Sequence, residues 1–262
     1  MRRLLRSKLL WFAPGLIALA WVLGWSLFFL EVAPPEPPAE RHDVAQAHYD
    51  DLLARVVDAR GAVDYARLRR ERAALDAYLG WVAVAPLDWE QLEAPDLAFL
   101  LNAYNAWVLH GVLQDDPARD VGEHKLEFFL RRRYRIAGRW IPLHWLEHRV
   151  IRARFDEPRV HFALNCASRG CPPLLNRRYD RHRLEADLGA AESRTLDDPR
   201  YARWDGDVLE VSALFEWFAG DFQPTPEAYL RAARPRWPWS ERTELRSLPW
   251  DWSLNRARAT DD

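Results

Sequence analysis

The sequence predicts an α+β fold: a single globular domain of mixed helices around a small, mostly antiparallel sheet, preceded by one N-terminal transmembrane helix. Apolar residues recur at helical spacing in several segments, and strand-like runs lie between them without regular alternation of strand and helix. Of 262 residues, 49% are hydrophobic and 14 are Trp, which suffices for a full core and excludes a disordered chain. The formal net charge of -2 excludes a nucleic-acid binder that works by bulk positive charge.

The N-terminal region predicts a membrane anchor. Residues 1–8 form a basic tail, and the uncharged run 9–30 is long enough, at about 33 Å, to cross a bilayer as a signal-anchor helix. Because the basic residues precede it, we expect a single-pass protein of the inner (cytoplasmic) membrane with its N-terminus in the cytoplasm. A proline-rich spacer, 31–42, then leads to a periplasmic or extracellular domain, 43–262.

The remaining elements follow in order along the exported part. Helical spacing predicts helices over 43–58, 64–83, 96–113, around 143–154, and over 180–196, 212–219 and 226–233. Turn residues predict hairpins over 134–141 and 201–211, and Pro158 precedes a run, 159–165, that predicts a buried strand. Helix 96–113 is apolar almost all round, which predicts a central core helix with Asn102 and Asn105 on one face. Scattered Trp residues, Trp217 and Trp250 among them, are expected to be mostly core.

The densest group of reactive side chains is the segment 161–173, where the predicted strand enters a turn. A thiol nucleophile needs a base and a group that orients the base, so the sequence predicts Cys166 as nucleophile, His161 as base and Asn105 as orienter. The expected substrate-binding residues are Asn102, Asn165, Ser168, Arg169 and Cys171. On a straight strand His161 and Cys166 would lie about 16 Å apart, so a sharp turn, the other sulfur, or a base such as His110, His144 or His148 remains open.

Three states of the two cysteines remain open. An exported domain would oxidise two Cys residues in one turn to a disulfide, which would fix the shape of the turn. A reactive thiol and two unpaired packing thiols are the alternatives. The spacing Cys-x4-Cys is not that of a zinc site, and no second close pair follows, so we expect no metal and no cofactor.

Four stretches resemble the bacterial members of the domain of unknown function 547 family. They are 101–110 (LNAYNAWVLH), 136–139 (IAGR), 155–173 (FDEPRVHFALNCASRGCPP) and 250–255 (WDWSLN), in the order of the family. The family has Tyr where this chain has Trp250. The resemblance covers about 45–256 and implies no settled reaction. It implies that Asn102, Asn105, His161, Cys166 and Pro172 are signature positions.

The sequence therefore leads to two main hypotheses of function. The first is an envelope thiol hydrolase or acyl transferase that acts on a peptide or peptidoglycan-like amide. The second is a non-catalytic binding or scaffold module whose disulfide-rigidified turn recognises a peptide, a glycan or an envelope protein. A redox protein that cycles Cys166 and Cys171 is a third hypothesis, although Cys-x-x-Cys is the usual spacing. The expected partners are the membrane, through the N-terminal helix, and no nucleic acid.

Overall fold

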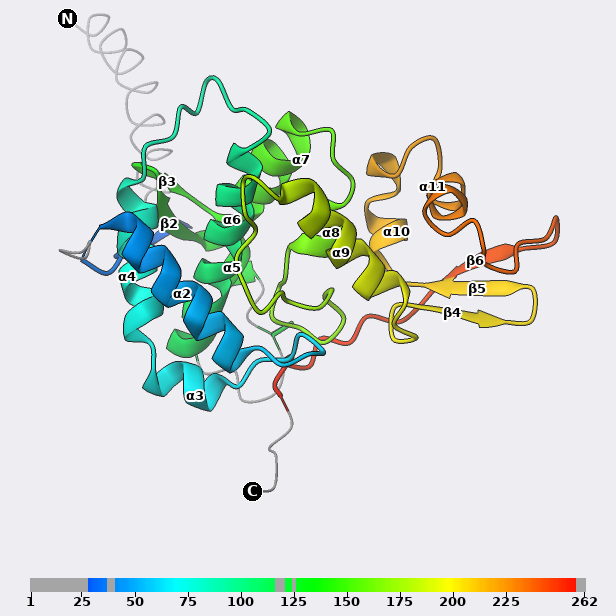
Figure 1. Ribbon diagram of the computed structural model, residues 1–262, viewed down its shortest axis with the longest axis horizontal. Helices are drawn as coiled ribbons and strands as arrows, with labels where there is room; N and C mark the ends of the chain where they lie inside the picture. Colours follow the sequence, from blue (N-terminus) through cyan, green and yellow to red (C-terminus); the bar gives the residue numbers. More distant parts are fainter. Residues whose placement is uncertain (1–27, 37–40, 116–120, 124–125, 258–262) are drawn as a thin grey trace, which may run out of the picture.

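The computed structural model describes residues 28–36, 41–115, 121–123 and 126–257. Figure 1 shows a larger lobe, which holds α2 to α8, and a smaller lobe, which projects to one side and carries α10, α11 and β4 to β6. Among the described residues, buried apolar side chains form one cluster in each lobe. The predicted α+β class is confirmed, with two small sheets in place of the predicted single sheet.

The helices of the larger lobe are packed around one central helix. They are α2 (His42–Val56), α3 (Tyr65–Arg70), α4 (Ala73–Val84) and α5 (Asp96–Asp115). Sixteen residues of α5 are buried, as its apolar sequence predicts. Gly111 allows the close packing of this helix, because a Cβ there would lie 1.9 Å from the ring of Phe128. The predicted helix over 64–83 is interrupted between Arg70 and Ala73, and Asp64 caps its first half by accepting from Arg67 N.

The first sheet contains β1 (Leu30–Val32), β2 (Arg132–Ile136) and β3 (Arg139–Ile141) in that order. The hairpin predicted over 134–141 is confirmed as the antiparallel pair β2–β3, and β1 lies parallel to β2. Ala137 and Gly138 form the turn with φ values of 45° and 79°, the left-handed conformation that two-residue hairpin turns use. Their N–H groups donate to the carbonyls of Val82 and Ala83, which joins the hairpin to the end of α4.

The helix predicted around 143–154 is confirmed. It consists of α6 (Leu143–Trp145), the π-helical segment η2 (Leu146–Ile151) and α7 (Arg152–Arg154). A second π-helical segment, η1 (Leu126–Arg131), precedes the hairpin. Short π-helical segments are rare and occur frequently at functional sites.

The buried strand predicted over 159–165 is wrong, because Val160–Ala163 form a helical turn, α8. The N–H groups of Val160 and His161 donate to the carbonyls of Glu157 and Pro158, so the chain coils directly after the proline. A short apolar run is compatible with either a buried strand or a buried helix, and periodicity does not separate the two.

The smaller lobe follows α9 (Leu184–Leu196), which lies between the lobes in Figure 1. Its elements are β4 (Ala202–Asp205), β5 (Val208–Val211), α10 (Leu214–Trp217), η3 (Ala219–Asp221), α11 (Pro226–Ala233) and β6 (Glu244–Ser247). Strands β4 and β5 form the predicted antiparallel hairpin, and β6 lies parallel to β5. Each sheet thus has one parallel pair, so the prediction of a mostly antiparallel sheet is wrong.

The C-terminal segment after β6 returns to the larger lobe. Asn255 N donates to Ala167 O, and the carbonyl of Asn255 accepts from Val63 N. Arg169 N donates in the same way to Ser253 O. This segment therefore ties the turn at 166–170 to the start of the domain.

The predicted transmembrane helix at 9–30 is not supported, because no helix in the described ranges is long and apolar enough to cross a membrane. Residues 9–27 of that prediction lie outside the described ranges, as does the basic tail 1–8. Leu30, the last residue of the prediction, begins β1 and pairs with Arg132. Of the predicted spacer 31–42, residues 37–40 also lie outside the described ranges.

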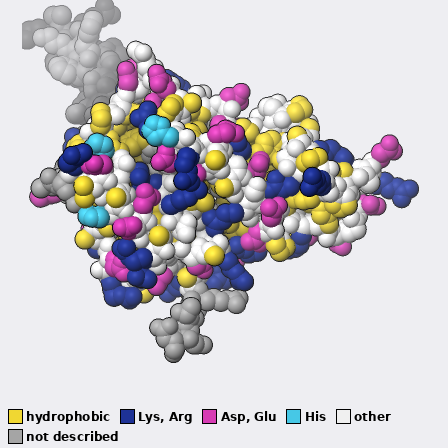
Figure 2. Space-filling view, in the orientation of Figure 1, with side chains coloured by type: hydrophobic (Ala, Val, Ile, Leu, Met, Phe, Trp, Pro, Cys, Tyr) yellow, Lys and Arg dark blue, Asp and Glu magenta, His cyan; other side chains and the backbone are white. Residues whose placement is uncertain are grey.

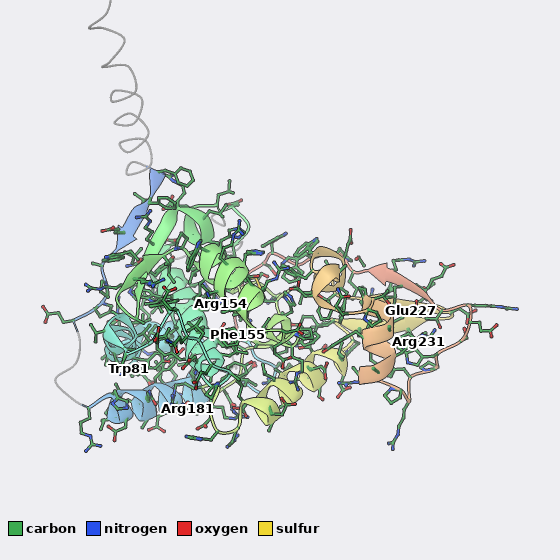
Figure 3. The ribbon with its side chains drawn as sticks, turned by 90° about the horizontal axis from the view of Figure 1, so that it is seen from above. Trp81, Arg154, Phe155, Arg181, Glu227 and Arg231 are labelled. Carbon is green, nitrogen blue, oxygen red and sulfur yellow. A yellow bond between two sulfur atoms is a disulfide. The ribbon has the colours of Figure 1, made fainter. Side chains whose placement is uncertain are left out.

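Basic and acidic side chains are interspersed over the face of the molecule drawn in Figure 2, and the net charge of the chain is small, at -2. The view from above in Figure 3 shows the projection of the smaller lobe again. Glu227 and Arg231 of α11 lie there, far from Trp81 in the larger lobe.

Candidate functional site

Two asparagines from the sequence motifs hold the chain at the end of α8. Asn105, on the central helix α5, donates from Nδ2 to Ala163 O over 2.9 Å and accepts Asn165 N at Oδ1 over 2.9 Å. Asn105 is 5% exposed, so both bonds are shielded from water. Asn105 therefore holds the start of the turn by hydrogen bonds to its backbone. The sequence predicted it as the group that orients a catalytic base.

Asn165 is the internal support of the turn itself. Its Oδ1 accepts Ala167 N over 2.8 Å and Asn255 Nδ2 over 3.1 Å, and its Nδ2 donates to Pro172 O over 2.8 Å. One buried side chain thus joins both ends of the turn and the C-terminal segment. This arrangement gives Asn165 a structural role, and its contact with substrate stays a prediction.

A disulfide joins Cys166 to Cys171. A thiol nucleophile requires a free thiolate, which Cys166 does not offer while it is bonded to Cys171, and its role as nucleophile stays a prediction. Cys171 is buried, and Ser168 Oγ lies 3.2 Å from Cys166 Sγ and accepts from Trp250 Nε1 over 3.0 Å. Ser168 therefore anchors the C-terminal aromatic residues to the disulfide.

Replacing both cysteines with serine is expected to lower the free energy of unfolding by about 2 kcal/mol, because so short a crosslink removes little chain entropy. Denaturant unfolding of the non-reduced protein and of the double variant measures this difference. Alkylation of the unfolded, non-reduced wild type should label no thiol, whereas prior reduction should make both available. Two labelled thiols without reduction would contradict the disulfide.

A cleft of about 290 Å³ opens beside this turn. The central helix, both π-helical segments, α6, α10 and the C-terminal segment contribute to it together with the disulfide. Most lining side chains are apolar or aromatic, among them Phe129, Leu164, Pro172, Leu214, Phe218 and Trp250. A concave apolar site with a few polar groups is the usual form of a small-ligand site.

Three tryptophans form the aromatic side of the cleft. Trp217 from α10 packs on Trp250, with ring centroids 4.7 Å apart, and on Trp252 at 6.3 Å. Trp217 remains 48% exposed, so it does not belong to the core, where the sequence predicted that most of the scattered tryptophans lie. Large aromatic surfaces exposed in a cleft favour contact with a partner.

Glu147 is the carboxyl group of the cleft. Tyr104 Oη donates to Glu147 Oε2 over 3.2 Å. Burial raises the pKa of Glu147 to about 7, although the Tyr104 bond and the charge of Arg152 act in the opposite direction. Its side chain is 16% exposed, so this carboxyl exchanges protons near neutral pH inside an apolar site.

Two histidines of the cleft are joined through an ion pair. Arg152 binds Asp221 with both ends of its guanidinium, at 2.6 and 3.0 Å, and also contacts His148 Nδ1. His161 Nε2 lies 2.7 Å from the same carboxylate of Asp221. Burial lowers the pKa of His148 and of His161 to about 4, so both rings are neutral at pH 7. The Nε2 atom of His161, the predicted base, is therefore already in contact with Asp221.

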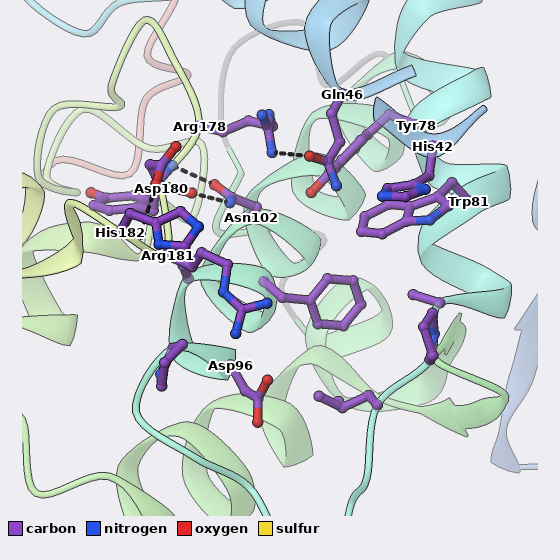
Figure 4. A pocket seen from close by; sticks show the side chains of 17 residues that line it. His42, Gln46, Tyr78, Trp81, Asp96, Asn102, Arg178, Asp180, Arg181 and His182 are labelled. Atoms are coloured by element: carbon purple, nitrogen blue, oxygen red, sulfur yellow. Dashed lines mark hydrogen bonds between the residues drawn. The ribbon is translucent and has the colours of Figure 1, made fainter. Parts of the chain in front are cut away.

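Two predicted binding residues lie elsewhere. Asn102 exchanges two hydrogen bonds of 2.8 Å with the backbone of Tyr179, and it lines a second cavity of about 370 Å³. Figure 4 shows this cavity, with Asn102 near Arg181 and with His42 against Trp81 on the opposite side. Arg169 is exposed and lines neither cavity. Within the described ranges no group of three or more His, Cys, Asp or Glu residues is arranged to hold a metal ion.

Glu147, Tyr104 and Asp221 are site residues that were not predicted from the sequence. One signal was present: His144, Glu147 and His148 have the spacing i, i+3, i+4, which places three side chains on one side of a predicted helix. Asp221 carried no such signal, because it comes from the smaller lobe and meets His161 only in the folded chain.

Fold and site together define an α+β protein in which a disulfide-bonded turn borders an aromatic cleft with buried ionisable groups. Residues 90–194 match the model of a family described as protein of unknown function, DUF547. The match supports the resemblance that the sequence motifs indicated. It runs from the segment before α5 into α9, so it includes the disulfide, while the smaller lobe lies beyond it. No curated protein and no solved structure matches the chain.

Proposed function

We propose that this chain is a recognition protein whose cleft receives an apolar acyl or aromatic group of a peptide or peptide-like partner. The observation that carries the proposal is that the disulfide and the exposed ring of Trp217 line the same apolar cleft. The turn is held by the disulfide and by Asn165, so the cleft is preformed and binding orders little additional chain.

The recognition hypothesis is favoured over the thiol-enzyme hypothesis because Cys166 is bonded to Cys171. A peptide is favoured over a glycan because most of the lining is apolar and offers few groups to sugar hydroxyls. We propose in addition that the domain works in an oxidising compartment outside the cytoplasm, since disulfides persist there.

Binding of 3-phenylpropanamide tests this proposal. We expect saturation-transfer NMR to detect the compound at millimolar concentration, because a ligand of this size gains about 0.3 kcal/mol or more per heavy atom. Trp217→Ala should weaken binding at least about tenfold, since it removes an exposed aromatic wall of the cleft.

Two controls make the result specific. Trp145→Ala removes another exposed tryptophan, which does not line the cleft, and should leave binding unchanged. Acetamide lacks the apolar group and should not bind. Equal binding to wild type and to Trp217→Ala would contradict recognition in this cleft.

A further inference from the structure

Glu147 and His148 are neighbours in η2, and both line the cleft. Glu147 Oε1 lies 3.9 Å from His148 Nε2, which is too far for a direct hydrogen bond. The two groups are therefore not bonded to each other, and each can bind an oxygen atom of a molecule in the cleft. The other carboxylate oxygen, Oε2, is held by Tyr104, which orients Oε1 toward this space.

The contact with Arg152 determines the tautomer of His148. A guanidinium only donates hydrogen bonds, so His148 Nδ1 must be the acceptor and carry no proton. The neutral ring then carries its proton on Nε2, on the side of Glu147. Asp221 holds Arg152 through two bonds, which makes Arg152 and Asp221 positioning residues for this tautomer.

The groups around Glu147 leave its carboxylate available as a base. Tyr104 comes from α5, His144 and His148 from the helical run 143–154, Arg152 from α7, and Asp221 from η3. Arg152 is the cation among them, and it is paired with Asp221. Within the described ranges no Lys or Arg forms an ion pair with Glu147, and the His148 ring 3.9 Å away is neutral at pH 7. A base beside a neutral imidazole N–H is an arrangement that serves reactions of carbonyl groups.

We propose that Glu147 and His148 catalyse hydrolysis of a carboxylic ester or amide whose apolar acyl group occupies the cleft. This inference rests on the proposed binding of such a group. Water forms the new C–O bond with the acyl carbon while Glu147 takes its proton. The electron pair of the C=O bond moves to the carbonyl oxygen, which accepts the N–H of His148. Collapse of this intermediate breaks the bond to the leaving group, which takes the proton from Glu147.

Hydrolysis of p-nitrophenyl 3-phenylpropanoate and p-nitrophenyl butyrate, followed by release of p-nitrophenol, tests the proposal. The wild type should hydrolyse both esters faster than buffer alone, and the rate should rise with pH through about 7 as Glu147 ionises. Glu147→Gln keeps the shape of the side chain but removes the base, and should reduce the rate by about 100-fold or more.

Glu90→Gln is the matched control, because Glu90 is an exposed carboxylate outside the cleft. Its rate should stay within about twofold of the wild type. An unchanged rate in Glu147→Gln, or no hydrolysis of either ester by the wild type, overturns the catalytic proposal. If 3-phenylpropanamide still binds in that case, recognition stands without catalysis; if it does not bind, both proposals fail.

Discussion

Replacing Asn165 with alanine is expected to lower the free energy of unfolding by about 3–5 kcal/mol, because three buried hydrogen-bonding groups lose their partner at once. These groups are Pro172 O, Ala167 N and the side-chain amide of Asn255. The turn that carries the disulfide should loosen before the rest of the fold. Denaturant unfolding measures the loss of stability, and hydrogen exchange of Ala167 N measures the local loosening.

Asn176 provides the control for this substitution. It is an exposed asparagine a few residues further along the same connection, so Asn176→Ala should change the free energy of unfolding by less than about 0.5 kcal/mol. Equal effects of the two substitutions would contradict the assignment of Asn165 as the support of the turn.

Glu147→Gln is expected to stabilise the protein at pH 8 and to have little effect near pH 4. The pKa of Glu147 is about 7 in the folded protein, above its ordinary value of 4.5. Between these values the unfolded chain releases the proton while the folded protein retains it, so stability falls as pH rises through this window. The complete shift corresponds to about 3 kcal/mol, and partial exposure of the side chain makes the gain in the variant smaller.

Denaturant unfolding of the wild type and the variant at both pH values measures this effect. Glu90→Gln should show no comparable difference, because Glu90 is 79% exposed. A variant that is less stable than the wild type at pH 8 would show that the carboxylate of Glu147 is stabilised by its surroundings, contrary to the raised pKa.

Local signals in the sequence predicted most helices and both hairpins. The start of α11 illustrates this, since Thr225 accepts Ala228 N and Pro226 occupies the first turn, as the prediction from 226 required. The helix α8 was missed because its apolar residues are buried on all sides and leave no periodicity. Parallel pairing of β1 with β2 and of β6 with β5 depends on distant segments, which a local pattern does not contain.

The candidate site was predicted only in part, for a related reason. The sequence located the turn with Cys166 and Cys171, because thiols and turn residues are dense there. It did not indicate that Glu147 would be buried beside that turn, since the raised pKa arises from packing between α5 and η2. The role of Asn105 also required the structure, because an amide that binds backbone groups and one that orients a catalytic group look alike in sequence.

Because the C-terminal segment returns to the larger lobe, the parts of the site are completed in a fixed order during synthesis. Tyr65 donates to Asn255 Oδ1, a contact that spans 190 positions of the chain, and Asn255 in turn binds Asn165. Trp250, which donates to Ser168 and lines the cleft, also belongs to this C-terminal segment. Both cysteines are therefore synthesised well before Trp250 and Asn255, and the cleft is completed only after this later segment has been made and has returned to the turn.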